Sequence, residues 1–210
     1  PPPTVPPRSP PQGHSIGEVA AAHAAGLLSV KDAIRTAHVL GKAGAECMGA
    51  MAHTRWSRAE LHAQSTSGGA EGSVPWQQHE LCVAAINGVS TDELLSVTLC
   101  GPAQRVESWI DSHSDAKLLL PPHPWHHPMY LDVASVQDGS AFNALPACSH
   151  TTAEVGETFL SASTHGVNRL DAAGWRHWLT TPVDFKGALE RAAASLGGGS
   201  DCYLIETGAH

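Results

Sequence analysis

The chain has 210 residues, a formal net charge of -8 and 42% hydrophobic residues. This hydrophobic content is enough for a buried core, which excludes wholesale disorder, and the length fits one domain or one domain carrying a smaller insertion. The 12 Lys and Arg residues are scattered along the chain. This argues against a nucleic acid partner, because phosphate binding depends on clustered positive charge.

The sequence contains no apolar run long enough to span a membrane and no signal-peptide pattern at its start. Its 5 Cys residues are widely spaced and form no C-x-x-C pair, which is typical of reduced thiols inside a cell. We therefore expect a soluble protein of the cytoplasm or of an organelle, with no membrane partner.

Residues 1–12 are rich in proline, which lacks the amide hydrogen that an interior strand needs. The motif GHSIG follows at residues 13–17 and has the form G-x-S-x-G, typical of a sharp turn that exposes a nucleophilic serine, here Ser15. Flanking glycines allow close backbone approach, and the next helix would direct the amide of Ile16 at a developing oxyanion. As a bare pattern, the motif is equally compatible with a small-residue turn before a helix.

Two helices are predicted after the motif. The first runs from Ile16 to about Gly26, where the glycine ends it. The second starts at the capping residue Ser29, has Asp32 in the capping-box position, and ends at Gly41.

Residues 50–122 form a separate unit of alternating strands and helices. Asn87 and Gly88 are interpreted as a turn between two of the strands. The order βαββαβ is typical of a ferredoxin-like sandwich, which here would be an insertion. The predicted strands are 50–54, 81–86, 94–99 and 117–120, and the predicted helices are 57–64 and 102–112.

Three histidines, His123, His126 and His127, lie in the stretch HPWHHPMY. They could bind a metal, but no Cys, Asp or Glu nearby completes a ligand set. A surface run between prolines is the simpler interpretation of the pattern taken alone. A helix at 184–196 and a strand at 202–206 are predicted to follow, after a tryptophan-rich segment at 175–179.

With these pieces in order, the chain resembles the acyltransferase domain of polyketide and fatty-acid synthases, the malonyl-CoA:acyl-carrier-protein transacylase family. Four stretches carry the resemblance: GHSIGEVAAAHAAGLLSVKDAI from residue 13, AAINGVSTDELLSVTLCGPAQRVESWI from 84, HPWHHPMY from 123, and WRHWLTTPVDFKGAL from 175 with YLIETGAH at the end. The resemblance implies an α/β fold. Its core would be a partial α/β-hydrolase-like acyltransferase subdomain, residues 13–49 and 123–210, with the ferredoxin-like small subdomain, residues 50–122, inserted.

The resemblance also implies the chemistry. Ser15 would be acylated by an acyl-CoA and would pass the acyl group to the phosphopantetheine thiol of an acyl carrier protein. A serine hydroxyl needs a base within hydrogen-bond reach, and His126 matches the family's histidine. A slip of one residue in the alignment makes His127 the base instead. We expect no bound cofactor or metal, and the partners would be acyl-CoA, the carrier protein and neighbouring synthase domains.

Leu40 stands where members that use extender units carry an arginine that pairs with the malonyl carboxylate. A carboxylate buried there without a partner would cost several kcal/mol, so the sequence predicts a monocarboxylic acyl group. His14 and Trp125 are the other candidate substrate-binding residues, and the bulk of Trp125 favours small or unbranched groups.

Two alternatives stay open. Relatives that also lack the arginine include acyl hydrolases that release stalled chains from carrier proteins. In addition, the family has a region before the serine motif that supplies a second oxyanion donor, and here proline-rich sequence stands in its place. We therefore expect a domain truncated at its N-terminus, for which an inactive acyltransferase fragment is the further alternative.

Overall fold

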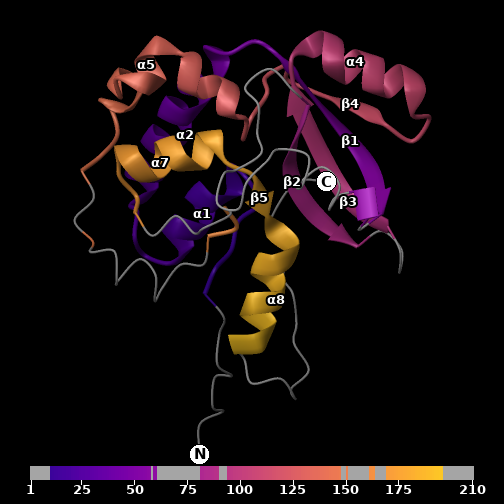
Figure 1. Ribbon diagram of the computed structural model, residues 1–210. Coiled ribbons are helices and arrows are strands. Elements are labelled where there is room, and N and C mark those ends of the chain that lie inside the picture. Colours follow the sequence, from indigo (N-terminus) through magenta and orange to yellow (C-terminus); the bar gives the residue numbers. More distant parts are fainter. Residues whose placement is uncertain are drawn as a thin grey trace, which may run out of the picture.

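The structure is a computed structural model that describes residues 10–57, 59–60, 81–89, 94–147, 150, 161–163 and 169–195. Residues 1–9, most of the predicted helix at 57–64 and the predicted strand at 202–206 lie outside this part of the chain. The described residues form a mixed α/β structure in which a group of helices lies beside one sheet (Figure 1).

The helical group contains elements from both ends of the chain. It consists of α1 (Gly17–Ala24), α2 (Val30–Ala45), the 3-10 turns η1 (Pro128–Asp132) and η2 (Ser140–Phe142), α5 (Ala134–Gln137) and α7 (Ala172–Thr180). Their apolar faces share one core, whose largest side chains include Tyr130, Trp175 and Trp178. Packing of this kind stabilises short helices that would not persist alone in water.

The structure confirms the predicted helix-end signals at two positions. Gly26 has φ 79 and follows α1, and the Leu27 amide donates to the Ala22 carbonyl at 3.0 Å, which together make a Schellman-type end. Ser29 caps α2, because its side chain accepts a 3.1 Å bond from the amide of Asp32.

The predicted end of the second helix at Gly41 is wrong, since α2 continues to Ala45. A glycine inside a helix costs about 1 kcal/mol relative to alanine. Burial of Val39, Leu40 and Ala43 on the same helix outweighs that cost.

The sheet has five strands in the order β4-β1-β3-β2-β5. β1 (Ala50–Ser57) pairs antiparallel with β3 (Leu94–Gly101) and β4 (Lys117–Leu119), and β3 pairs antiparallel with β2 (Cys82–Val89). α4 (Ala103–Ser112) packs on β1 through Val106, which is fully buried against Ala50 and Ala52. β1 to β4 and α4 therefore occupy the stretches where strands and a helix were predicted, and β2 extends through Asn87.

The last strand connects the sheet to the helical group. β5 (Val183–Asp184) pairs in parallel with β2, and Ser163 forms an isolated bridge to Val183. α8 (Phe185–Ser195) follows directly and buries Ala188 against Ala85 and Ala162. Figure 1 shows β5 between the helices and the sheet, with α8 extending below it.

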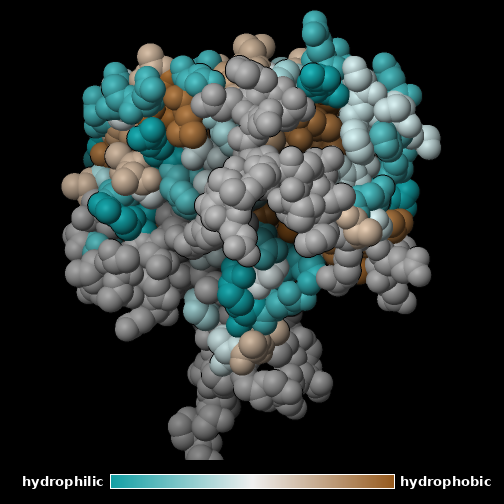
Figure 2. Space-filling model, viewed as in Figure 1, coloured by the Kyte–Doolittle hydropathy of each residue, from teal (hydrophilic) through white to brown (hydrophobic). Residues whose placement is uncertain are grey.

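On the face shown in Figure 2 the described surface is mainly hydrophilic, and its hydrophobic areas are small and separated. None of the helices in the described ranges combines the length and the hydrophobicity that crossing a lipid bilayer requires. The three cysteines in these ranges, Cys47, Cys82 and Cys100, are buried and are not part of a disulfide.

Candidate active site

Ser15 lies in a tight turn directly before α1. Its φ is 53, in the left-handed region that a residue with a side chain rarely adopts, at a cost of order 1 to 3 kcal/mol. The turn is closed by the Gly17 amide, which donates to the His14 carbonyl at 2.9 Å. A Cβ at Gly13 would lie 2.1 Å from the Gly17 carbonyl carbon, so position 13 requires glycine.

Gly17 differs from Gly13, because a Cβ there would have no described atom within 4 Å. Close backbone approach therefore explains only the first glycine of the motif. The strained backbone of Ser15 has the form of a nucleophile elbow, which presents the hydroxyl away from the chain.

The Ser15 hydroxyl is hydrogen-bonded to His126, with 2.7 Å between Oγ and Nε2. The other ring nitrogen, Nδ1, lies 2.9 Å from the carbonyl oxygen of Trp178. A carbonyl oxygen only accepts hydrogen bonds, so Nδ1 carries the proton and donates. In the neutral ring Nε2 is then the acceptor for the serine proton, which is the tautomer that a general base needs.

The environment of His126 keeps the ring neutral. Its side chain is buried, and burial lowers its pKa from 6.5 to about 4, although hydrogen bonding to the backbone of Trp178 and Thr181 acts in the opposite direction. The edge of the Trp178 indole contacts the imidazole, with 4.7 Å between ring centroids. The lone pair on Nε2 is therefore available at neutral pH.

The other two histidines of the stretch have different partners. His123 Nδ1 donates to the Cys47 carbonyl across 3.3 Å, while His127 Nδ1 accepts from the Met129 amide at 2.9 Å at the start of η1. Within the described ranges, no three His, Cys, Asp or Glu side chains are grouped as metal ligands would be. Of the two candidate bases, His126 is the one that contacts Ser15.

The structure places the remaining sequence-predicted site residues around the turn or in the core. Ile16 is the residue before the first turn of α1 and its side chain is about half exposed. Trp125 packs against Gly44, where a Cβ would lie 2.1 Å from the indole, and meets Trp178 edge-on at 5.9 Å. Leu40 is fully buried in the helical core.

His14 connects the serine turn to the sheet. Its Nε2 lies 2.7 Å from Asn87 Oδ1 on β2, and its ring meets Phe185 of α8 edge-on at 5.1 Å. The Asn87 amide nitrogen in turn donates to Thr98 Oγ1 at 3.0 Å. The interpretation of Asn87 as a turn residue is wrong, because β2 continues through it, and no sequence signal indicated its contact with the turn.

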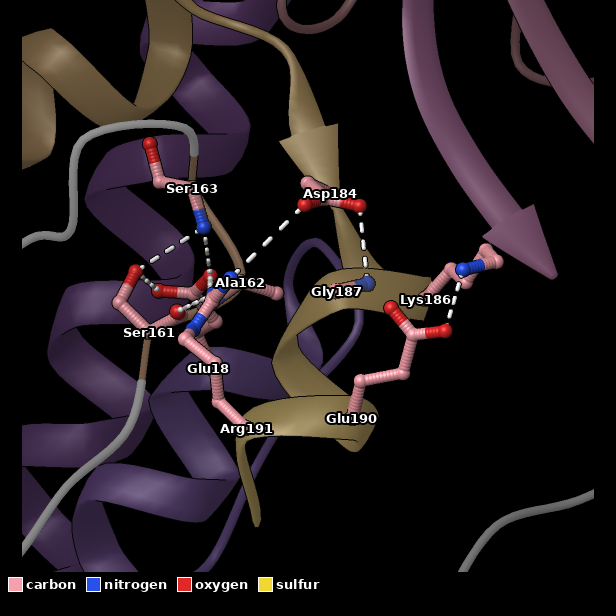
Figure 3. Close-up of polar contacts among 9 residues, drawn as sticks. All are labelled: Glu18, Ser161, Ala162, Ser163, Asp184, Lys186, Gly187, Glu190 and Arg191. Atoms are coloured by element: carbon pink, nitrogen blue, oxygen red, sulfur yellow. Dashed lines mark hydrogen bonds and ion pairs between the residues drawn. The ribbon is translucent and has the colours of Figure 1, made fainter. Parts of the chain in front are cut away.

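Glu18 is a second residue that the sequence reasoning missed. It lies in the first turn of α1, is fully buried, and points its carboxylate at residues 161–163 (Figure 3). Burial raises its pKa from 4.5 to about 7, against the lowering effect of hydrogen bonds from Ser161, Ala162 and Ser163. The position of Glu18 directly after the G-x-S-x-G motif was the only sequence signal for this buried carboxyl.

The chain is similar to known proteins in both sequence and fold. The highly reducing polyketide synthase fogA of Aspergillus ruber is 31% identical over 221 residues. A solved acyltransferase domain from the second module of the salinomycin polyketide synthase is 28% identical, with a TM-score of 0.58 over 89% of this chain. The chain is therefore similar in sequence and in fold to acyltransferase domains of polyketide synthases. No protein-family model matches it.

A second solved structure is similar in fold alone. It is a malonyl-transacylase solved in complex with its type II polyketide synthase acyl-carrier protein, with a TM-score of 0.62 at 18% identity. The chain spans only part of these relatives: the matches cover 8% of the fogA synthase, 41% of the salinomycin acyltransferase chain and 58% of the malonyl-transacylase chain.

Proposed function

We propose that this chain is an acyltransferase domain that moves an acyl group from acyl-CoA, through an ester on Ser15, to the phosphopantetheine thiol of an acyl carrier protein. The observation that carries the proposal is the hydrogen bond between Ser15 Oγ and His126 Nε2, with the tautomer of His126 set by the Trp178 carbonyl. A serine on a strained turn, paired with a neutral buried imidazole, is a nucleophile with its base in contact.

In the first half-reaction, Ser15 Oγ attacks the thioester carbonyl while His126 Nε2 takes the hydroxyl proton. The oxyanion of the tetrahedral intermediate would be stabilised by the amide of Ile16 at the start of α1. Collapse of the intermediate breaks the carbon–sulfur bond, and the imidazolium returns its proton to the departing CoA thiolate. The Trp178 carbonyl, which accepts from Nδ1, stabilises the transient imidazolium without taking a proton.

In the second half-reaction the carrier thiol takes the place that CoA left. His126 removes the thiol proton, the sulfur attacks the Ser15 ester, and the proton is returned to Ser15 Oγ as the acyl group departs. No bound cofactor or metal takes part in either half. The carrier protein as partner is supported by the malonyl-transacylase of similar fold, and neighbouring synthase domains by the size of the fogA synthase.

The acyl group in this proposal is monocarboxylic. Leu40, at the position of the family's carboxylate-binding arginine, is an uncharged side chain buried among apolar residues. The Leu40 side chain carries no positive charge that could pair with a substrate carboxylate. The free energy lost on removing that carboxylate from water would therefore not be recovered there. Trp125, held against Gly44 and Trp178, adds a rigid aromatic surface that favours small or unbranched groups.

The subdomain assignment is part of the same proposal. The strand order β4-β1-β3-β2, with α4 packed on β1, supports residues 50–122 as the ferredoxin-like small subdomain. Residues 13–49 and 123–210 would form the larger α/β-hydrolase-like subdomain. His14 and Asn87 then lie on opposite sides of the boundary between the two.

The test compares acetyl-CoA with malonyl-CoA as donors and follows the acyl group onto a holo acyl carrier protein by intact-protein mass spectrometry. We expect acetyl loading to be faster than malonyl loading, and the carrier protein to gain the acyl group. Faster loading from malonyl-CoA contradicts the argument from Leu40. Release of free acid from an acylated carrier, with no transfer to the carrier, would assign the site to an acyl hydrolase instead.

A further inference from the structure

The buried carboxylate of Glu18 connects two parts of the candidate active site. On one side, Glu18 belongs to the serine turn, since its amide donates to the Ser15 carbonyl at 2.9 Å. Glu18 therefore lies three positions after the nucleophile, and both belong to one hydrogen-bonded turn that leads into α1. A displacement of the first turn of α1 would displace Ser15 with it.

On the other side, the carboxylate holds residues 161–163. Oε1 accepts from the amides of Ala162 and Ser163 at 3.0 and 3.2 Å, and Oε2 accepts from the Ser161 hydroxyl at 2.9 Å (Figure 3). These partners are dipoles, and no ion pair to Glu18 occurs among the described residues. Removing the carboxylate would take the acceptor from the buried amide of Ala162, which is costly, whereas the amide of Ser163 would keep its 3.1 Å bond to Ser161 Oγ.

Residues 161–163 in turn support the segment that holds His126. Ser163 Oγ lies 3.0 Å from Thr181 Oγ1, and Ser163 bridges to Val183 of β5. Thr181 follows α7 directly, and its backbone is hydrogen-bonded to His126. The Trp178 carbonyl that fixes the tautomer of His126 belongs to the same end of α7.

We propose that Glu18 is a positioning residue, whose carboxylate joins the serine turn to residues 161–163 and thereby sets the contact between Ser15 and His126. This inference rests on the proposed function only in taking Ser15 as the nucleophile. The evidence for this positioning role is the series of contacts that leads from Glu18 through Ser163 and Thr181 to the imidazole of His126. A displacement of a nucleophile from its base by about 1 Å lowers the reaction rate by about 10²-fold.

The test measures how fast Ser15 reacts with a fluorophosphonate probe, per folded molecule, in Glu18→Ala, Glu18→Gln and Val19→Ala. We expect a loss of about 10²-fold in E18A. E18Q should stay close to wild type, because the Gln Oε1 accepts from both amides and its Nε2 donates to Ser161. Val19 is buried next to Glu18 but has an apolar side chain, so V19A reports the effect of destabilising α1 alone.

Two results would overturn the proposal: a wild-type rate in E18A, or an equal loss in V19A. Glu18→Asp provides the same test if E18A does not fold, because its carboxylate is one methylene too short to reach residues 161–163. The ¹⁵N resonance of His126 Nε2 is an independent readout, and in E18A it should shift toward its value in Ser15→Ala. An unchanged resonance would also overturn the proposal.

The fluorophosphonate probe reacts with Ser15 without acyl-CoA. The experiment can therefore contradict the positioning role of Glu18 without contradicting the proposed acyltransferase function, and the reverse. A chain that reacts with the probe in a Glu18-dependent way, but loads no acyl group from any acyl-CoA, would contradict the proposed function alone. If the wild type does not react with the probe, the resonance of His126 still decides on Glu18.

Discussion

Replacing Glu18 by Gln should make the protein more stable at pH 8 than the wild type, by an amount that shrinks toward pH 5. The carboxyl is fully buried, and burial raises its pKa from 4.5 to about 7. The native state therefore favours the protonated form more than the unfolded state does. The stability penalty of ionising Glu18 is absent below pH 4.5 and complete above pH 7.

The size of the effect follows from the change in pKa. Each unit is worth about 1.4 kcal/mol, so the shift of Glu18 corresponds to about 3 kcal/mol at full ionisation. Between pH 5 and pH 8 the difference in unfolding free energy between E18Q and wild type should change by about 2 to 3 kcal/mol. Because Gln keeps the shape and the hydrogen-bonding capacity of the side chain, this change isolates the charge.

His126 acts in the opposite direction, which is why a comparison of two proteins is needed. Burial lowers its pKa from 6.5 to about 4, so its contribution to stability is present above pH 6.5 and is lost as the pH falls toward 4. In the wild type, ionisation of Glu18 lowers the unfolding free energy as the pH rises from 4.5 to about 7, whereas deprotonation of His126 raises it between about pH 4 and 6.5. The two effects therefore oppose each other over most of the same pH range. In the difference between E18Q and wild type, the His126 contribution cancels.

The assay is urea unfolding of wild type and E18Q at pH 5, 6, 7 and 8, followed by circular dichroism, with equal m-values as the check for two-state behaviour. Val19→Ala is the matched control, because it lies next to Glu18 and has no ionisable group, so its difference from wild type should not depend on pH. A constant difference between E18Q and wild type across this range would refute the assignment of a raised pKa to Glu18.

Three further predictions concern the serine turn and the core. Gly13→Ala should cost several kcal/mol in urea unfolding, because its Cβ meets the backbone of Gly17, whereas Gly17→Ala should cost much less; equal losses would contradict the geometry of the turn. Leu40→Ala should lower the unfolding free energy by about 2 to 5 kcal/mol through the cavity it leaves, and a loss below 1 kcal/mol would argue against its full burial. Asn87→Ala should slow probe labelling of Ser15 without a comparable loss of stability, since it releases His14 from β2; an unchanged rate would show that this contact is dispensable.

The sequence motifs predict which residues meet, although they lie far apart in the chain. The turn at Ser15 and the histidine stretch were each ambiguous, and only their combined resemblance to acyltransferase domains paired Ser15 with His126. The structure brings these two side chains into hydrogen-bond contact. Strands with strong apolar patterns, such as β2 and β3, and capped helix ends, such as that at Ser29, were also predictable.

Features set by tertiary contacts were not predictable. The roles of Glu18 and Asn87 depend on partners at residues 161–163 and at His14, and neither pairing leaves a periodic pattern. β5 has two residues, too few for a pattern, and is ordered by its pairing with β2. α2 continues past Gly41 because packing of its neighbours outweighs a local preference.

The most direct test of the account is the site of acylation and its dependence on His126. Wild type, Ser15→Ala, His126→Ala and His127→Ala are incubated with labelled acetyl-CoA, and the modified peptide is identified by mass spectrometry. We predict an ester on Ser15 in wild type and in H127A, and none in S15A or H126A. Full loading of H126A, or no ester on Ser15 in a folded wild-type sample, would contradict the claim that these two residues form the catalytic pair.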